Sequence, residues 1–98
     1  MMSDRLMKRV VLTADKIRDK ESMAAFMKAA LDLPEYFGGN LDALADLLSE
    51  IREDTVFELE ESELDRMPED GYCARTLNVL NIAAQENPHL HLYLTSGF

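Results

Sequence analysis

Short strand-like segments alternate with helix-like segments along the chain, and this alternation limits the folds open to it more than any other feature. Runs of β-branched or alternating apolar residues predict strands at 7–14, 55–59 and 89–94. Apolar residues at helical spacing predict helices at 21–32, 40–53 and 72–86. Because helices join the strands, we expect crossover connections and therefore a parallel sheet.

The last predicted strand indicates how many faces of that sheet are covered. Its residues alternate, so that three leucines share one face and the other face carries His89, His91 and Tyr93. A parallel strand covered on both sides would be almost entirely apolar. We therefore expect an α/β fold of two layers, with the helices on one face of a small sheet and the other face partly open.

The helix ends carry recognisable signals. Ser22 or Asp19 is expected near the start of the first helix, and Pro34 follows its end. Asn40 is the expected N-cap of the second helix. The expected buried positions are Met23, Phe26, Met27, Ala30, Leu31, Leu41, Leu44, Leu48, Ile51, Leu77, Leu80 and Ala84. The acidic connection at 60–69 leaves room for one helical turn.

Length and composition set the broad class. Ninety-eight residues, 47% of them apolar and 30% charged, predict one globular domain spanning 1–98. No apolar run reaches the roughly 18 residues of a membrane span. The first residues lack the apolar core and cleavage site of a signal peptide, and a single Cys73 cannot form an internal disulfide. A reducing, cytoplasmic location is therefore expected.

The charge is negative and unevenly distributed. The net charge is −9; residues 1–28 hold seven bases and four acids, whereas residues 29–98 hold three bases and fifteen acids. Such a surface repels nucleic acid and favours encounter with a basic partner. Net charge alone is equally compatible with a surface that is acidic only for solubility.

The second predicted helix contains two aspartates, and helix stability gives a reason for the first but not for the second. Asp42 lies in the first turn, where the helix dipole favours an acid by about 0.3–1 kcal/mol. Asp46 lies beyond that turn and faces Asp42 four residues back, a like-charge pair that costs roughly 0.2–0.5 kcal/mol. No Lys or Arg stands three or four residues from Asp46. A solvated helix face and a binding face both remain open on these numbers.

The preceding loop favours a binding face. Gly38 and Gly39 allow a tight turn or the close approach of another surface. Tyr36 is an aromatic residue with a polar tip, a type enriched at interface hot spots. Together with the two aspartates, this loop predicts a docking surface for a cationic partner.

The segment LPEYFGGNLDALADLL at 33–48 resembles the barstar family of ribonuclease inhibitors, whose members carry LPxYxGxNLDALxD at this place. The resemblance extends more loosely from about residue 7 to residue 95. It implies a small parallel sheet of three strands packed against helices on one face. It also implies an inhibitor rather than an enzyme, with no cofactor, that binds a basic ribonuclease of the extracellular type without binding nucleic acid or membrane. The free protein is expected to be a monomer.

The resemblance also implies how the partner is bound. By position, Asp46 would stand where the RNA phosphate sits in the ribonuclease, and Asp42 would pair with a neighbouring basic group of the enzyme. Tyr36 would pack in the mouth of the cleft. Gly38, Gly39 and Asn40 would shape the loop. Ala45 falls within this partner-binding segment, at a position where the best-known member has an aromatic residue, and Ile82 falls where that member has an interface acid.

Some residues of the sequence are also compatible with other chemistries. His89 and His91 have a spacing that could hold a metal, but no third ligand is indicated. Cys73 could serve as a nucleophile, although a lone cysteine at a helix start is more often a small buried apolar residue. The aspartate pair could act in acid–base catalysis only in a buried cleft. The alternative functions are an acidic module that occludes another nucleic-acid-binding protein, and a small enzyme using the carboxylates or Cys73.

Overall fold

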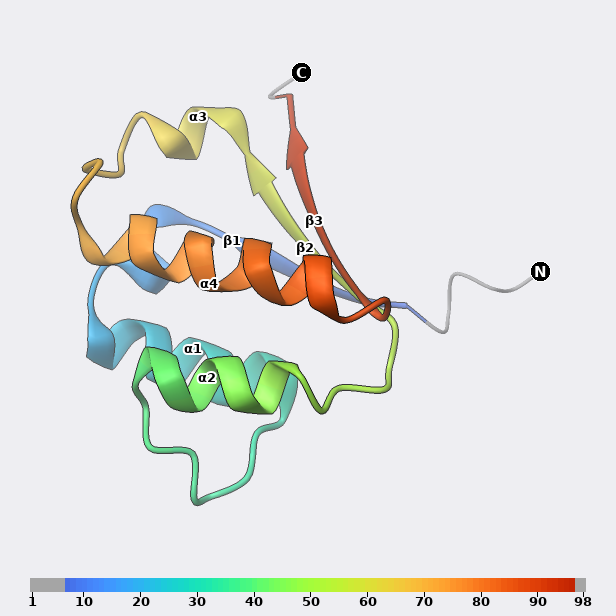
Figure 1. The fold of residues 1–98 in the computed structure, drawn as a ribbon. Helices are drawn as coiled ribbons and strands as arrows, with labels where there is room; N and C mark the ends of the chain where they lie inside the picture. Colours follow the sequence, from blue (N-terminus) through green and yellow to red (C-terminus); the bar gives the residue numbers. More distant parts are fainter. Residues whose placement is uncertain (1–6, 97–98) are drawn as a thin grey trace.

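The structure is a computed structural model that describes residues 7–96 (Figure 1). Its elements follow in the order β1 (Lys8–Leu12), the 3-10 turn η2 (Ala14–Ile17), α1 (Lys20–Leu31), α2 (Leu41–Leu48), β2 (Thr55–Glu60), α3 (Glu61–Leu64), α4 (Tyr72–Glu86) and β3 (Leu90–Thr95). The predicted domain of residues 1–98 includes residues 1–6 and 97–98, which lie outside this range. No helix among the described residues is both long and apolar enough to cross a membrane.

The three strands form one parallel sheet in the order β1-β2-β3. Val10, Phe57 and Leu92 are in register across it. The strand residues on this face join a core with residues from α1, α2 and α4, including Met23, Met27, Leu44, Leu48 and Leu80. The predicted α/β fold, with a three-stranded parallel sheet and helices on one face, is confirmed.

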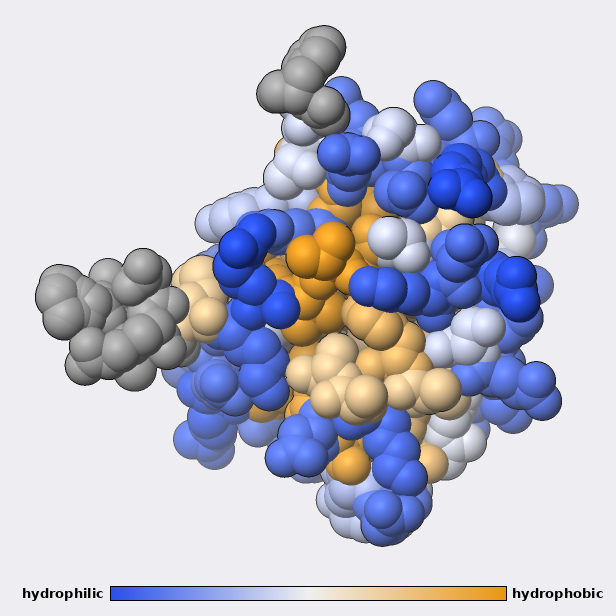
Figure 2. All heavy atoms as spheres, turned by 180° about the vertical axis from the view of Figure 1, so that it is seen from behind, coloured by the Kyte–Doolittle hydropathy of each residue, from blue (hydrophilic) through white to orange (hydrophobic). Residues whose placement is uncertain are grey.

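The opposite face of the sheet is partly open, as its alternating pattern predicts. Val11 and Tyr93 are 49% and 54% exposed there. Arg9 on β1 donates two hydrogen bonds to Glu58 on β2, at 2.7 and 3.1 Å, and this lowers the pKa of the Glu58 carboxyl. Seen from behind, the molecule shows a central apolar strip surrounded by polar residues (Figure 2).

Several boundaries differ from the sequence prediction. The first strand ends at Leu12 rather than residue 14, because the chain turns into η2, which periodicity did not reveal. Asp19 rather than Ser22 is the N-cap of α1, and its carboxylate accepts a hydrogen bond from the backbone N–H of Ser22 at 2.8 Å. The single turn expected in the acidic connection is present as α3. In α4 the buried alanine is Ala83, whereas Ala84 is half-buried.

The second helix is shorter than predicted, ending at Leu48 instead of residue 53. The reason is Asn87, which directly follows α4 and is only 7% exposed. Its side-chain amide donates to the carbonyls of Leu48 at 2.9 Å and Ile51 at 3.0 Å, and its oxygen accepts from the N–H of His89 at 2.9 Å. Asn87 therefore satisfies carbonyls that a longer helix would have used, and it ties the end of α2 to the start of β3.

We expect Asn87→Ala to lower the free energy of unfolding by about 2–3 kcal/mol, because the carbonyl of Ile51 loses the Asn87 amide and that of Leu48 keeps only the 3.3 Å bond from the N–H of Ile51. Asn78→Ala is the matched control, since Asn78 lies on the exposed side of the same helix. Urea unfolding of both variants measures the difference. A loss at Asn87 no larger than that at Asn78 would contradict the assigned hydrogen bonds.

Candidate functional site

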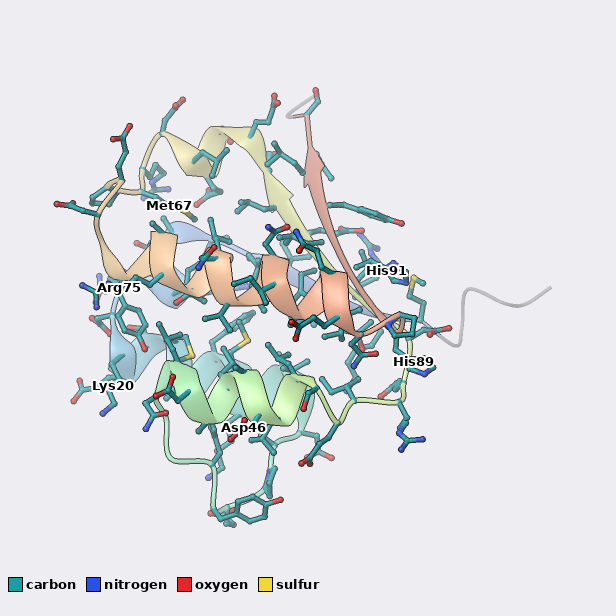
Figure 3. All side chains as sticks on the ribbon, viewed as in Figure 1. Lys20, Asp46, Met67, Arg75, His89 and His91 are labelled. Carbon is teal, nitrogen blue, oxygen red and sulfur yellow. The ribbon has the colours of Figure 1, made fainter. Side chains whose placement is uncertain are left out.

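The outer face of α2 carries the two predicted site carboxylates. Leu44 and Leu48 are fully buried and fix which side of the helix faces the core. Asp42 and Asp46 consequently lie on the exposed side. Figure 3 shows Asp46 on the side of α2 turned away from α4. The two side chains thus share an outward surface, as the four-residue spacing predicts.

The start of α2 is fixed by a side-chain cap. The Asn40 side-chain oxygen accepts a hydrogen bond from the backbone N–H of Ala43 at 2.7 Å. The predicted N-cap is confirmed, and it satisfies one of the free N–H groups of the first turn. Asn40 therefore also fixes where the preceding loop meets the helix.

The loop between α1 and α2 turns one aromatic residue inward and the next outward. Phe37 packs against the hydrophobic core, and its N–H donates to the carbonyl of Pro34 at 3.0 Å. The neighbouring Tyr36 is 78% exposed. The anchored Phe37 therefore holds the loop against the body while Tyr36 projects into solvent.

The fold constrains the two loop glycines differently. Gly39 is buried and adopts a φ of +78°, and a Cβ there would meet the Cβ of Ala24 in α1 at 3.2 Å. Gly38 is exposed, its φ is not positive, and a Cβ there would meet only the Asn40 amide nitrogen at 3.8 Å. Among the described residues, the fold accounts for glycine at position 39 but not at position 38.

The carboxylates of Asp42 and Asp46 have no partner within residues 7–96. No ion pair or side-chain hydrogen bond involves either carboxylate there; the Ser49 hydroxyl donates instead to the backbone carbonyl of Asp46 at 2.6 Å. The α2 helix itself contains no basic residue. Both carboxylates are therefore free to accept hydrogen bonds from another molecule.

A hollow lies beside α2 on the side of the loop. It has a volume of about 250 Å³ and is lined by Tyr36, Phe37, Ala43, Asp46, Leu47 and Glu50. Asp46 and Tyr36 therefore border one concave surface. Ala45, the remaining predicted site residue, is exposed on the other side of α2, where it faces α4.

The structure does not bring together the residues that could support other chemistries. Cys73 is buried at the start of α4, its thiol donates to the carbonyl of Ala14 at 3.6 Å, and burial raises its thiol pKa. A nucleophilic cysteine needs the opposite shift. His89 and His91 lie beyond the other end of α4 (Figure 3), and His89 contacts Asp54 at 2.9 Å. The described residues contain no group of three metal-ligating side chains.

The loop and α2 can be recognised from the sequence as a candidate site. The contributions of Asn87 and Ile82, in and just after α4, cannot. The sequence predicts Asn87 only as a residue that ends a helix, although its side chain binds the carbonyls at the end of α2. Ile82 is 44% exposed beside α2, and its place in a hollow depends on the packing of two distant segments. No local pattern indicates the role of Asn87, because the residues whose carbonyls it binds lie 39 and 36 positions away in the chain.

The comparison with protein-family models agrees with the motif at 33–48. The model described as Barstar (barnase inhibitor) matches residues 7–94, a range that includes every helix that the structure describes and the sheet as far as Leu94. The match confirms the resemblance identified from the sequence. The chain belongs to the barstar family.

Proposed function

We propose that this protein inhibits a basic ribonuclease of the barnase type by placing the outer face of α2 and the loop at 33–40 in the enzyme's phosphate-binding cleft. The observation that carries the proposal is the exposed Asp46 carboxylate, which has no partner within residues 7–96 and lies beside Tyr36. The family description, a barnase inhibitor, supports the same target class.

Asp46 acts as a mimic of the RNA phosphate. A carboxylate can accept paired hydrogen bonds from a guanidinium group, as a phosphate does. Asp42 lies one helical turn away and pairs with a second basic group of the enzyme. Neither aspartate must first break an internal ion pair with a described residue, so little of the binding free energy is lost in reorganisation.

Tyr36 and Gly38 provide the contacts that accompany the charges. Tyr36 covers the mouth of the cleft with a large aromatic surface. Its ring is available for this contact because it is exposed, while its neighbour Phe37 holds the loop against the core. Gly38 has no side chain although the fold leaves room for one. A partner backbone that approaches closely at this point explains the glycine.

Electrostatic attraction speeds the encounter. Residues 29–98 contain three bases and fifteen acids, and one nearby base, Lys28, is already paired with Glu35 at 3.1 Å. The surface around α2 is therefore negative where the enzyme's cleft is positive. Such complementarity raises association rates more than it raises affinity.

Asp46→Ala should leave folding intact and weaken inhibition by about 2–5 kcal/mol, because the enzyme's cation is left buried without a partner. The general range of about 2–5 kcal/mol is itself based partly on charge pairs measured in barnase–barstar complexes, so it is taken from this family and not from the present structure. The unfolding free energy should stay equal or rise slightly, since alanine removes the like-charge pair with Asp42.

The assay is inhibition of a set of purified basic ribonucleases of the barnase type, barnase included. Asp70→Ala is the matched control: it removes the same charge from an exposed turn remote from α2 in sequence. Equal loss of inhibition in both variants would show that net charge, not the position of Asp46, is responsible. Absence of inhibition by the wild-type protein throughout the set would contradict the proposed function.

The association rate constant should fall about tenfold or more between roughly 0.01 and 0.15 M salt, as the Debye length shortens from about 30 to about 8 Å. Stopped-flow mixing of the two proteins at several ionic strengths measures the effect. The dissociation rate should change much less. An association rate that does not respond to salt would rule out steering by the acidic surface.

The two glycines should separate binding from folding. Gly39→Ala should lower the unfolding free energy by about 1–2 kcal/mol, because an alanine would need a positive φ and would crowd α1. Gly38→Ala should unfold like the wild type yet inhibit more weakly, because its methyl group would meet the partner. Urea unfolding and inhibition titrations of both variants are required. A Gly38→Ala variant with unchanged inhibition would contradict close approach at this point.

A further inference from the structure

A second hollow lies on the other side of α2, between this helix and α4. Its volume is about 250 Å³, and most of its lining is apolar. The principal lining residues are Ala45, Ser49, Val79, Ile82, Ala83 and Glu86. Ala45 directly precedes Asp46 in the chain but lies on the other side of α2, so the helix separates this hollow from the one that Asp46 lines.

The hollow exists because a small residue and a large apolar residue face each other across the two helices. Ala45 is exposed and too short to fill the space, while Ile82 remains 44% exposed. A single exposed isoleucine is unremarkable on a protein surface. Here it borders a concave and mostly apolar surface within an otherwise acidic region, a shape and lining suited to receive an apolar side chain.

The walls of the hollow are held in place before any partner binds. Asn87 lines one end and donates hydrogen bonds to the carbonyls of Leu48 and Ile51. Ala83, on the adjoining wall, is buried in the core. The separation between the end of α2 and α4 is therefore fixed, and a partner side chain would enter a preformed space at little cost in ordering.

The helix α2 is consequently a ridge with a hollow along each side. The hollow shared by Tyr36 and Asp46 lies on the loop side, and the apolar hollow lies on the α4 side. Ala45 and Asp46 are adjacent in the chain but line different hollows. A ribonuclease cleft that spans α2 from the loop side to the α4 side therefore contacts both hollows.

We propose that the hollow between α2 and α4 receives one large apolar side chain from the rim of the ribonuclease's basic cleft, and that this contact selects which ribonucleases are inhibited. The inference rests on the proposed function. The lining favours an apolar occupant, and an apolar cavity of about 150 Å³ already accepts benzene, so the space is sufficient. Glu86 lines the hollow and Asp46 lies on the outer side of α2, so both acids complement a basic protein around that contact.

Two variants test the hollow in opposite ways, using the same set of purified basic ribonucleases, barnase included. Ile82→Ser removes an apolar wall, and Ala45→Leu occupies the space. For the enzyme that wild type inhibits best, each should raise the inhibition constant about 10- to 100-fold, the effect of losing one buried apolar side chain. Leu64→Ser is the matched control, because Leu64 is 39% exposed on α3. Circular dichroism and urea unfolding verify that each variant folds.

The pattern across variants separates this inference from the proposed function. Suppose that Asp46→Ala inhibits more weakly than wild type, whereas Ile82→Ser and Ala45→Leu inhibit as well as wild type or better. This result would overturn the proposed role of the hollow and leave the proposed function in place. Loss of inhibition in Leu64→Ser equal to that in Ile82→Ser would overturn it as well. If wild type inhibits none of the enzymes, the proposed function fails and the inference fails with it. Weakening by both hollow variants but not by Leu64→Ser supports the inference.

Discussion

The candidate site depends on a short helix that is fixed at both ends by asparagine side chains. An isolated helix of eight residues is not stable in water, so α2 must be held by its surroundings. Asn40 caps its first turn, and Asn87, 47 positions further along the chain, donates a hydrogen bond to the carbonyl of its last residue, Leu48. Leu44 and Leu48 bury the inner side. These few contacts determine the direction in which the outer side chains point.

Because the inner side and both ends are fixed, the outer side of α2 is free to carry residues that contribute little to folding. Asp46 is such a residue: it is a poor helix former beside a like charge, and it has no partner within residues 7–96. Tyr36 is likewise exposed because Phe37 anchors the loop in its place. The acidic ridge and the hollows on its two sides therefore form one surface whose shape is set by the core.

The sequence was sufficient for features that depend on local pattern and insufficient for those that depend on packing between distant segments. Periodicity located the three strands and the main helices, and the alternation of the last strand indicated a sheet open on one face. The side-chain chemistry of Asn40 correctly predicted a cap. The end of α2 was misplaced because the carbonyls of Leu48 and Ile51 bond to Asn87, a partner that no local pattern indicates. The hollow at Ala45 and Ile82 and the different constraints on Gly38 and Gly39 likewise emerge only from the packed structure.

The most direct test of the central claim is a map of the contact surface on the protein itself. Backbone amide chemical shifts of the labelled protein would be recorded with and without a catalytically inactive form of the ribonuclease that it inhibits best. Binding through the proposed surface predicts that the largest changes fall in the loop at 33–40 and in α2, with further changes near Ile82. Changes concentrated instead on the open face of the sheet, around Val11, Glu58 and Tyr93, would contradict the account.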